Sequence, residues 1–125
     1  MRSIAACAAA LLLSAPALAA PPPRPNAFNA QLRALSPADR AGALRRAVTL
    51  ANQRCGRLAQ SVDRGQYGNL GFWQVRCVPG GDYAVFTGPD GSVQVRGCAD
   101  MAALKLPACV AMKPEPAPPP APRRR

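Results

Sequence analysis

Residues 36–58, SPADRAGALRRAVTLANQRCGRL, begin with the signals of a helix start and end where the apolar pattern changes. The opening Ser-Pro-Ala-Asp supplies a capping hydroxyl, a proline at the first helical position and an acid in the first turn. Apolar residues then recur at spacings of three and four, which places them on one helical face. These residues are Ala41, Leu44, Val48, Ala51, Cys55 and Leu58. The pattern predicts an amphipathic helix that ends at Gly56, with Cys55 among its last residues.

The opposite face of this predicted helix is polar and strongly basic. That face carries Arg40, Arg45, Arg46, Gln53 and Arg54. On the N-terminal side, Phe28, Leu32 and Leu35 recur at spacings of four and three, and this pattern predicts a short preceding helix.

Beyond residue 57 the apolar period falls to about two, which is typical of strands. The expected strands are 58–63, 72–78, 83–87 and 92–96, separated by a glycine-rich loop at 64–71 and turns at 79–82 and 88–91. Apolar residues recur at alternate positions in the last three of these strands, so one face of the predicted sheet is expected to be buried. It carries Trp73, Val75, Cys77, Tyr83, Val85, Val93 and Val95. The sequence therefore predicts an α+β fold, in which the helix packs on an antiparallel meander of three to four strands.

The first 19 residues have the composition of a secretory signal peptide. A basic start precedes an apolar run at 4–13, and small residues before the predicted cut after Ala19 fit a signal peptidase. An uncleaved membrane anchor is the alternative, but a spanning helix needs about 20 apolar residues. We expect a periplasmic or secreted chain with a Pro-rich segment at 20–25, a single domain at 26–112 and a disordered, basic Pro-rich tail at 113–125.

Four cysteines follow the signal peptide, and an even number in an exported chain favours disulfide bonds. A loop centred near residue 67 brings Cys55 close to the strand that carries Cys77, so we predict Cys55–Cys77 and Cys98–Cys109. The alternative joins Cys55 to Cys98 and Cys77 to Cys109. A zinc site is disfavoured because the sequence has neither a Cys-x-x-Cys pair nor a histidine.

The absence of histidine removes the commonest general base and the commonest metal ligand. Most of the six acidic residues have capping, turn or tail roles, so we expect neither an enzyme nor a cofactor or metal site. With 16 basic residues against those six, the formal net charge is +10. We expect no nucleic-acid partner, because the chain is predicted to be exported and has no recognition motif.

The stretch 41–98 resembles a PepSY domain in its order of helix, strands and Gly/Asp turns. The matching segments read AGALRRAVTLANQRCGRLAQSV, GFWQVRC and DYAVFTGPDGSVQVRGC. The resemblance implies one helix on a small antiparallel sheet, a secreted or envelope location, and binding or restraint of a peptidase or another envelope protein. The cysteines, Cys55 and Cys77 in particular, depart from the family's pattern, and the resemblance carries no functional residues over.

Two surfaces are candidates for binding. The helix arginines with Arg57 and Arg64 could meet an anionic partner, although a merely solvated basic face is the alternative. The sheet face away from the helix suits a peptide or protein partner, unless Phe72 and Phe86 pack on the N-terminal helix or on the segment closed by Cys98–Cys109. That face carries Phe72, Gln74, Arg76, Phe86, Gln94 and Arg96. The candidate binding residues are Arg45, Arg46, Arg54, Arg57, Phe72, Arg76 and Phe86.

These observations predict an exported binding protein of the bacterial envelope. Its expected function is PepSY-like restraint of a peptidase or another envelope protein. The alternative is a basic adaptor that binds lipid head groups or cell wall, to which a cationic tail tip at 123–125 could contribute.

Overall fold

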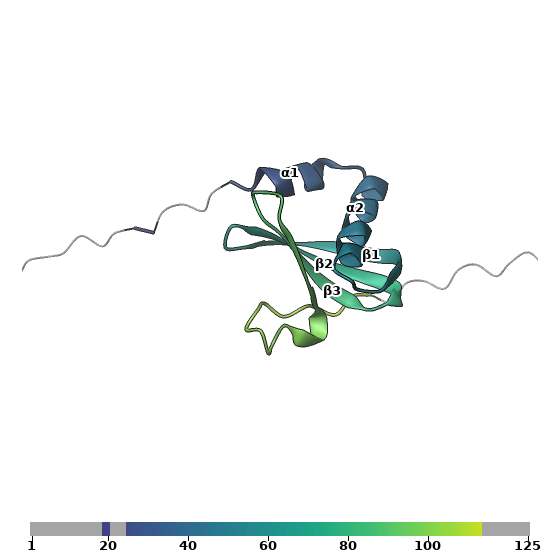
Figure 1. Ribbon diagram of the computed structural model, residues 1–125. Helices are drawn as coiled ribbons and strands as arrows, with labels where there is room; N and C mark the ends of the chain where they lie inside the picture. The colour runs from purple at the N-terminus through teal and green to yellow at the C-terminus, as the bar shows by residue number, and fades with distance from the viewer. Residues whose placement is uncertain (1–18, 21–24, 114–125) are drawn as a thin grey trace, which may run out of the picture.

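The computed structural model describes residues 19–20 and 25–113 (Figure 1). Residues 1–18 of the predicted signal peptide, residues 21–24 of the Pro-rich segment and residues 114–125 of the predicted tail lie outside the described part. The elements in the described part are α1 (Ala27–Ala34), α2 (Pro37–Leu50), β1 (Cys55–Tyr67), β2 (Leu70–Gly80), β3 (Asp82–Thr87), β4 (Val93–Gly97) and the 3-10 turn η1 (Cys98–Asp100). The strands form one antiparallel sheet in the order β1-β2-β3-β4, which confirms the predicted α+β meander.

The predicted start of α2 is confirmed, but its predicted end is wrong. The Ser36 hydroxyl accepts a hydrogen bond from the backbone N–H of Asp39 at 3.1 Å, as an N-cap does. The helix ends at Leu50 rather than at Gly56, because Asn52 takes a left-handed φ of 58° that stops it. Cys55 is therefore the first residue of β1. Cys55 continues the apolar spacing of the helix because its side chain faces the same core, although the chain has already left α2.

The glycine-rich segment predicted as a loop is also corrected. β1 continues to Tyr67, and only residues 68 and 69 connect it to β2. Gly65, with a φ of 88°, lies in an irregularity of the β1–β2 pairing, and Gly68, with a φ of 61°, opens the two-residue turn. Positive φ at these two positions accommodates a bulge and a tight hairpin without ending the strand pairing. The hairpin is therefore longer than its composition indicated.

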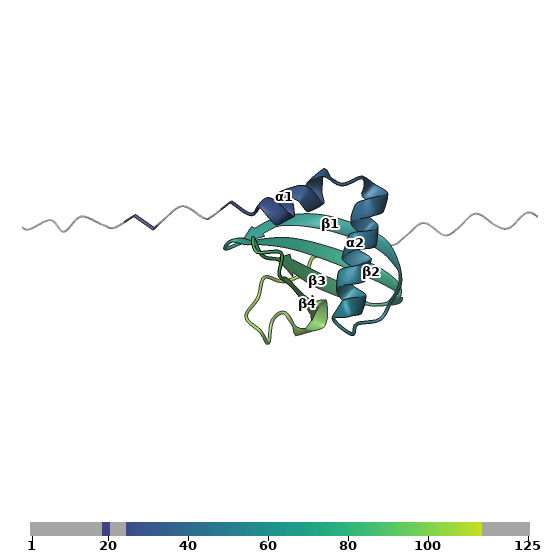
Figure 2. The same cartoon turned by 45° about the horizontal axis from the view of Figure 1, so that its top comes forward.

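The main core lies between the helices and the sheet. Figure 2 shows α2 lying across the strands, and Leu44 and Val48 on its inner side are 1% and 0% exposed. Six of the seven sheet residues predicted to face the helix are buried there. The seventh, Val93, lines a small cavity with Leu44 on that face but stays 41% exposed. Asn29 of α1 adds a polar contact, since its Oδ1 accepts a hydrogen bond from Trp73 Nε1 at 2.8 Å.

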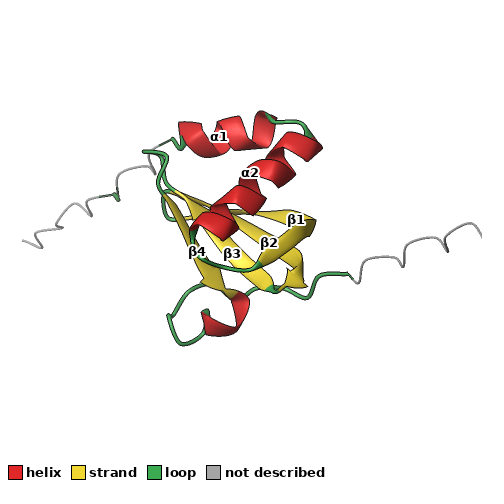
Figure 3. Ribbon diagram, turned by 45° about the vertical axis from the view of Figure 1, so that its right-hand side comes forward, coloured by secondary structure: helices red, strands yellow, loops and turns green. Residues whose placement is uncertain are grey.

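A second, smaller core lies on the other face of the sheet. Figures 1 and 3 show the helices on one side and residues 98–113 on the other, so the domain has three layers. Phe72, Ala84 and Phe86 of the sheet pack here with Met101, and all four are buried. The disulfide Cys98–Cys109 closes the covering segment.

The cysteine pairing follows the first of the two predictions. Cys55 bonds to Cys77, with their Cα atoms 4.8 Å apart, and Cys98 bonds to Cys109, with their Cα atoms 5.6 Å apart. The alternative pairing is wrong. The first bridge is buried in the main core, whereas both cysteines of the second are half-buried.

Candidate binding surfaces

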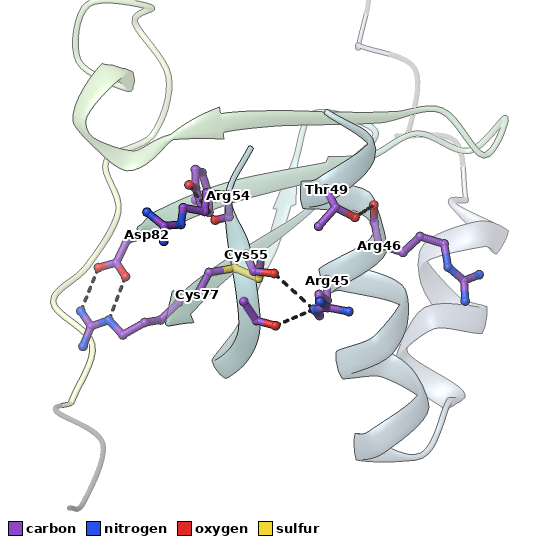
Figure 4. The surroundings of a disulfide bond; sticks show 10 residues. Arg45, Arg46, Thr49, Arg54, Cys55, Cys77 and Asp82 are labelled. Carbon is purple, nitrogen blue, oxygen red and sulfur yellow. Dashed lines mark hydrogen bonds and ion pairs between the residues drawn. A yellow bond between two sulfur atoms is a disulfide. The ribbon is translucent and has the colours of Figure 1, made fainter. Parts of the chain in front are cut away.

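Arg45 joins α2 to the start of β1. Its Nε donates hydrogen bonds to the carbonyl oxygens of Cys55 at 3.3 Å and Gly56 at 3.0 Å (Figure 4). Both carbonyls belong to β1, the edge strand that follows α2. The contact therefore fixes a guanidinium group at the α2–β1 junction.

An open groove lies beside this contact, between α2 and β1. Its volume is about 420 Å³. The groove is lined by Ala41, Gly42, Arg45, Gly56, Arg57 and Leu58. A Cβ on Gly56 would overlap Pro79 Cδ of β2, whereas a Cβ on Gly42 of α2 would meet nothing within 4 Å. Two of the predicted binding arginines, Arg45 and Arg57, therefore share one groove.

The other two arginines of this region do not converge on the groove. Arg46 follows Arg45 on the helix and points away from the disulfide, as Figure 4 shows. Arg54 is exposed immediately before β1. Neither Arg46 nor Arg54 forms an ion pair with any residue that the structure describes. The positive charge at this end of the domain is thus spread over a surface.

Three further arginines, on α1, α2 and β1, are engaged in internal contacts. Arg40 lies 5.6 Å from the ring centroid of Trp73 and donates a hydrogen bond to the carbonyl oxygen of Arg33 at 2.9 Å. Arg64 lies 6.0 Å from the ring centroid of Phe72. Arg33 pairs with Asp63, to whose carboxylate its Nε donates at 2.5 Å. These arginines are therefore less available to a partner than Arg46 and Arg54.

Arg76, predicted as a binding residue, instead forms contacts within the domain. Its Nε and Nη2 each donate to one carboxylate oxygen of Asp82, both at 2.8 Å. This bidentate hydrogen bonding lowers the pKa of Asp82 below its ordinary value, against the opposing effect of desolvation. Nη1 reaches the carbonyl oxygen of Lys113 at 3.4 Å, so the same side chain contacts the C-terminal segment.

The prediction that the second sheet face is exposed is wrong at its centre. Phe72 and Phe86 are each 3% exposed, Gln74 is 0% exposed, and the first two stack with centroids 5.0 Å apart. The alternative, in which both phenylalanines pack on the segment closed by Cys98–Cys109, is confirmed by the second core. Only Gln94 and Arg96, on the edge strand β4, are exposed as expected.

One signal in the sequence could have indicated this burial. The central strands carry large apolar residues on both faces, with Trp73 and Val85 on one and Phe72 and Phe86 on the other. Strands with apolar residues on both faces are typical of sheets covered on both sides. The covering segment itself has no helical or strand period, so its position could not be read from residues 98–113.

No group of three or more potential metal ligands occurs among the residues that the structure describes. The same residues contain no helix both long and apolar enough to cross a membrane. Comparison of the chain with models of protein families, with curated proteins and with solved structures finds no match.

Proposed function

We propose that this chain is a binding protein of the cell envelope that attaches to anionic lipid head groups through its α2–β1 basic surface. This surface consists of Arg45, Arg46, Arg54 and Arg57. The observation that carries the proposal is the excess of positive charge there, with Arg46 and Arg54 exposed and without an acidic partner among the described residues. The two disulfides are compatible with an oxidising compartment, where such a surface would meet phospholipids.

The arrangement of the arginines favours an extended anionic surface over a single bound anion. A phosphate site needs several donors directed at one point, whereas Arg45 and Arg46 point in different directions (Figure 4). A membrane presents many phosphates in a plane, so dispersed arginines can each meet one. Each Lys or Arg near such a surface contributes about 1 kcal/mol at moderate ionic strength.

Restraint of a peptidase, the other function expected from the sequence, has less support. It was assigned to the sheet face that carries Phe72, Gln74 and Phe86, and residues 98–113 cover the centre of that face. A folded partner would have to displace residues 98–109, which the Cys98–Cys109 disulfide and the second core hold in place. The α2–β1 basic surface needs no such rearrangement.

Two charge-matched double variants test the proposal by sedimentation with vesicles of phosphatidylglycerol or phosphatidylcholine. Arg46→Gln with Arg54→Gln should weaken binding to phosphatidylglycerol about 30-fold, which corresponds to about 2 kcal/mol for two arginines. The control, Arg96→Gln with Lys105→Gln, removes the same charge from exposed positions on β4 and in the segment that covers the opposite face. We expect it to change binding only a few-fold.

Binding to phosphatidylglycerol should also fall steeply as salt rises, because exposed charges are screened. Equal weakening by the two double variants would show that net charge rather than this surface matters. Binding that is equal for the two lipids, or undiminished at about 0.5 M salt, would contradict an electrostatic attachment.

A further inference from the structure

The side chain of Gln74 contacts the backbone of a segment that runs across the sheet. It lies at the centre of β2 and is fully buried. Its Nε2 donates a hydrogen bond to the carbonyl oxygen of Val110 at 2.5 Å, and its Oε1 accepts one from the N–H of Val110 at 2.9 Å. The amide therefore pairs with both backbone groups of one residue, as a neighbouring strand would.

Two more side chains of the sheet contact the same segment through its backbone. Gln60 Nε2 donates to the carbonyl oxygen of Lys113 at 2.6 Å. Arg76 Nη1 lies 3.5 Å from the carbonyl oxygen of Met112 and 3.4 Å from that of Lys113. We call residues 110–113 the strap. All these hydrogen bonds reach backbone atoms of the strap, so they do not depend on the identity of its side chains.

Only one strap side chain is buried. Met112 is 9% exposed, whereas Val110 is 41% exposed, and Ala111 and Lys113 are also exposed. Backbone hydrogen bonds combined with one apolar anchor are the features by which proteins bind extended peptides. The sheet face beneath the strap thus has the properties of a peptide site, and the strap shows what fits it.

The strap is held less firmly than the segment before it. The disulfide Cys98–Cys109 ties the chain down up to residue 109, and the strap begins directly after it. The second core is covered by residues before the strap, chiefly Met101 with Leu106 and Cys109. Ordering the backbone of four residues costs conformational free energy, and this cost is comparable to the stabilisation from one buried methionine and a few hydrogen bonds. The strap can therefore leave without uncovering that core.

We propose that this face is a peptide-binding site which the strap occupies in the resting chain. An extended segment of a partner protein, with an apolar side chain at the position of Met112, binds there after displacing the strap. Because the strap competes from within the same molecule, it acts at high effective concentration. It therefore sets the affinity that a partner segment needs in order to bind.

The test uses the mature chain and a fluorescent peptide, Ala-Ala-Val-Ala-Met-Lys, which has the sequence of residues 108–113 with alanine in place of the cysteine. Met112→Asp removes the apolar anchor of the strap, and fluorescence polarisation should show the peptide binding this variant about tenfold or more tightly than the unmodified chain. Adding Gln74→Leu should abolish the gain. A peptide with aspartate in place of methionine is the control ligand.

Equal affinity of the peptide for the unmodified chain and for Met112→Asp would overturn the proposal. So would a stable dimer of the variant that excludes the peptide, because the site would then take a second copy of this chain.

A second measurement needs no variant and remains decisive if Met112→Asp fails to fold. Hydrogen exchange of the Val110 amide should be about 100-fold or more faster than exchange of the Val85 amide in β3, since strap release is local. Exchange of both amides at the same rate would mean that the strap opens only when the whole domain unfolds, and the proposal would fail.

Discussion

The buried disulfide Cys55–Cys77 allows a quantitative prediction of its contribution to stability. The bridge closes a loop with a sequence separation of 22 residues. Loop-closure entropy for that length amounts to about 3.4 kcal/mol at 25 °C. Cys55→Ala with Cys77→Ala should therefore lower the free energy of unfolding by at least this amount, because the alanines also leave unfilled volume in the main core. A domain of this kind has about 5–15 kcal/mol in total, so the loss is large.

Urea unfolding followed by fluorescence of the single tryptophan measures this loss. Trp73 is 3% exposed in the same core, so its emission reports whether that core is intact. Cys98→Ala with Cys109→Ala is the matched control, since a separation of 11 residues gives about 2.8 kcal/mol. The Cys55–Cys77 pair should therefore be the more costly to remove. A loss below about 1 kcal/mol, or the reverse order, would refute the reasoning from loop length and burial.

Four further substitutions have predictable effects. Gly42→Ala should raise the free energy of unfolding by about 0.5–1 kcal/mol, because an added Cβ at this helical position meets no other atom within 4 Å. Gly56→Ala should lower it by about 1–3 kcal/mol, because the added Cβ overlaps Pro79. Thermal melting of the two variants measures both effects. Asn29→Ala should lower it by about 2 kcal/mol and shift the indole N–H resonance, because the buried indole loses its acceptor. The pKa of Asp82 is lowered in the folded state, so its stabilising contribution is complete above about pH 4 and lost as the pH falls through that lowered value. Asp82→Asn should flatten the acid side of the stability profile, and an unchanged profile would contradict this sign.

The elements fixed by short-range chemistry were predictable from the sequence. The start of α2 followed from the residues after Ser36, and the tight turn at 88–91 followed from its glycine and aspartate residues. The pairing of Cys55 with Cys77 followed from hairpin geometry, because strands joined by a short loop bring residues at fixed sums of sequence number together. These features depend on neighbouring residues or on one hairpin.

The features that depend on distant segments were not predictable. Asn52 ended α2 early, although the apolar spacing ran on to Cys55 and Leu58. Phe72 and Phe86 were assigned to an exposed face because residues 98–113 show no periodicity that would mark them as its cover. The role of Gln74 was hidden for the same reason, since a glutamine in a strand gives no sign that its partner lies 36 residues away.

The topology has a consequence for how the chain acquires its structure. In the part of the chain that the structure describes, each strand pairs with the next one in the sequence, and the four cysteines bond in consecutive pairs. A chain that crosses a membrane N-terminus first, as the predicted signal peptide implies, would expose Cys55 and Cys77 to an oxidase before Cys98 and Cys109 have emerged. The native bridges are then also the first ones that can form. For a chain exported in this way, an enzyme that makes disulfides would suffice, without one that reshuffles them.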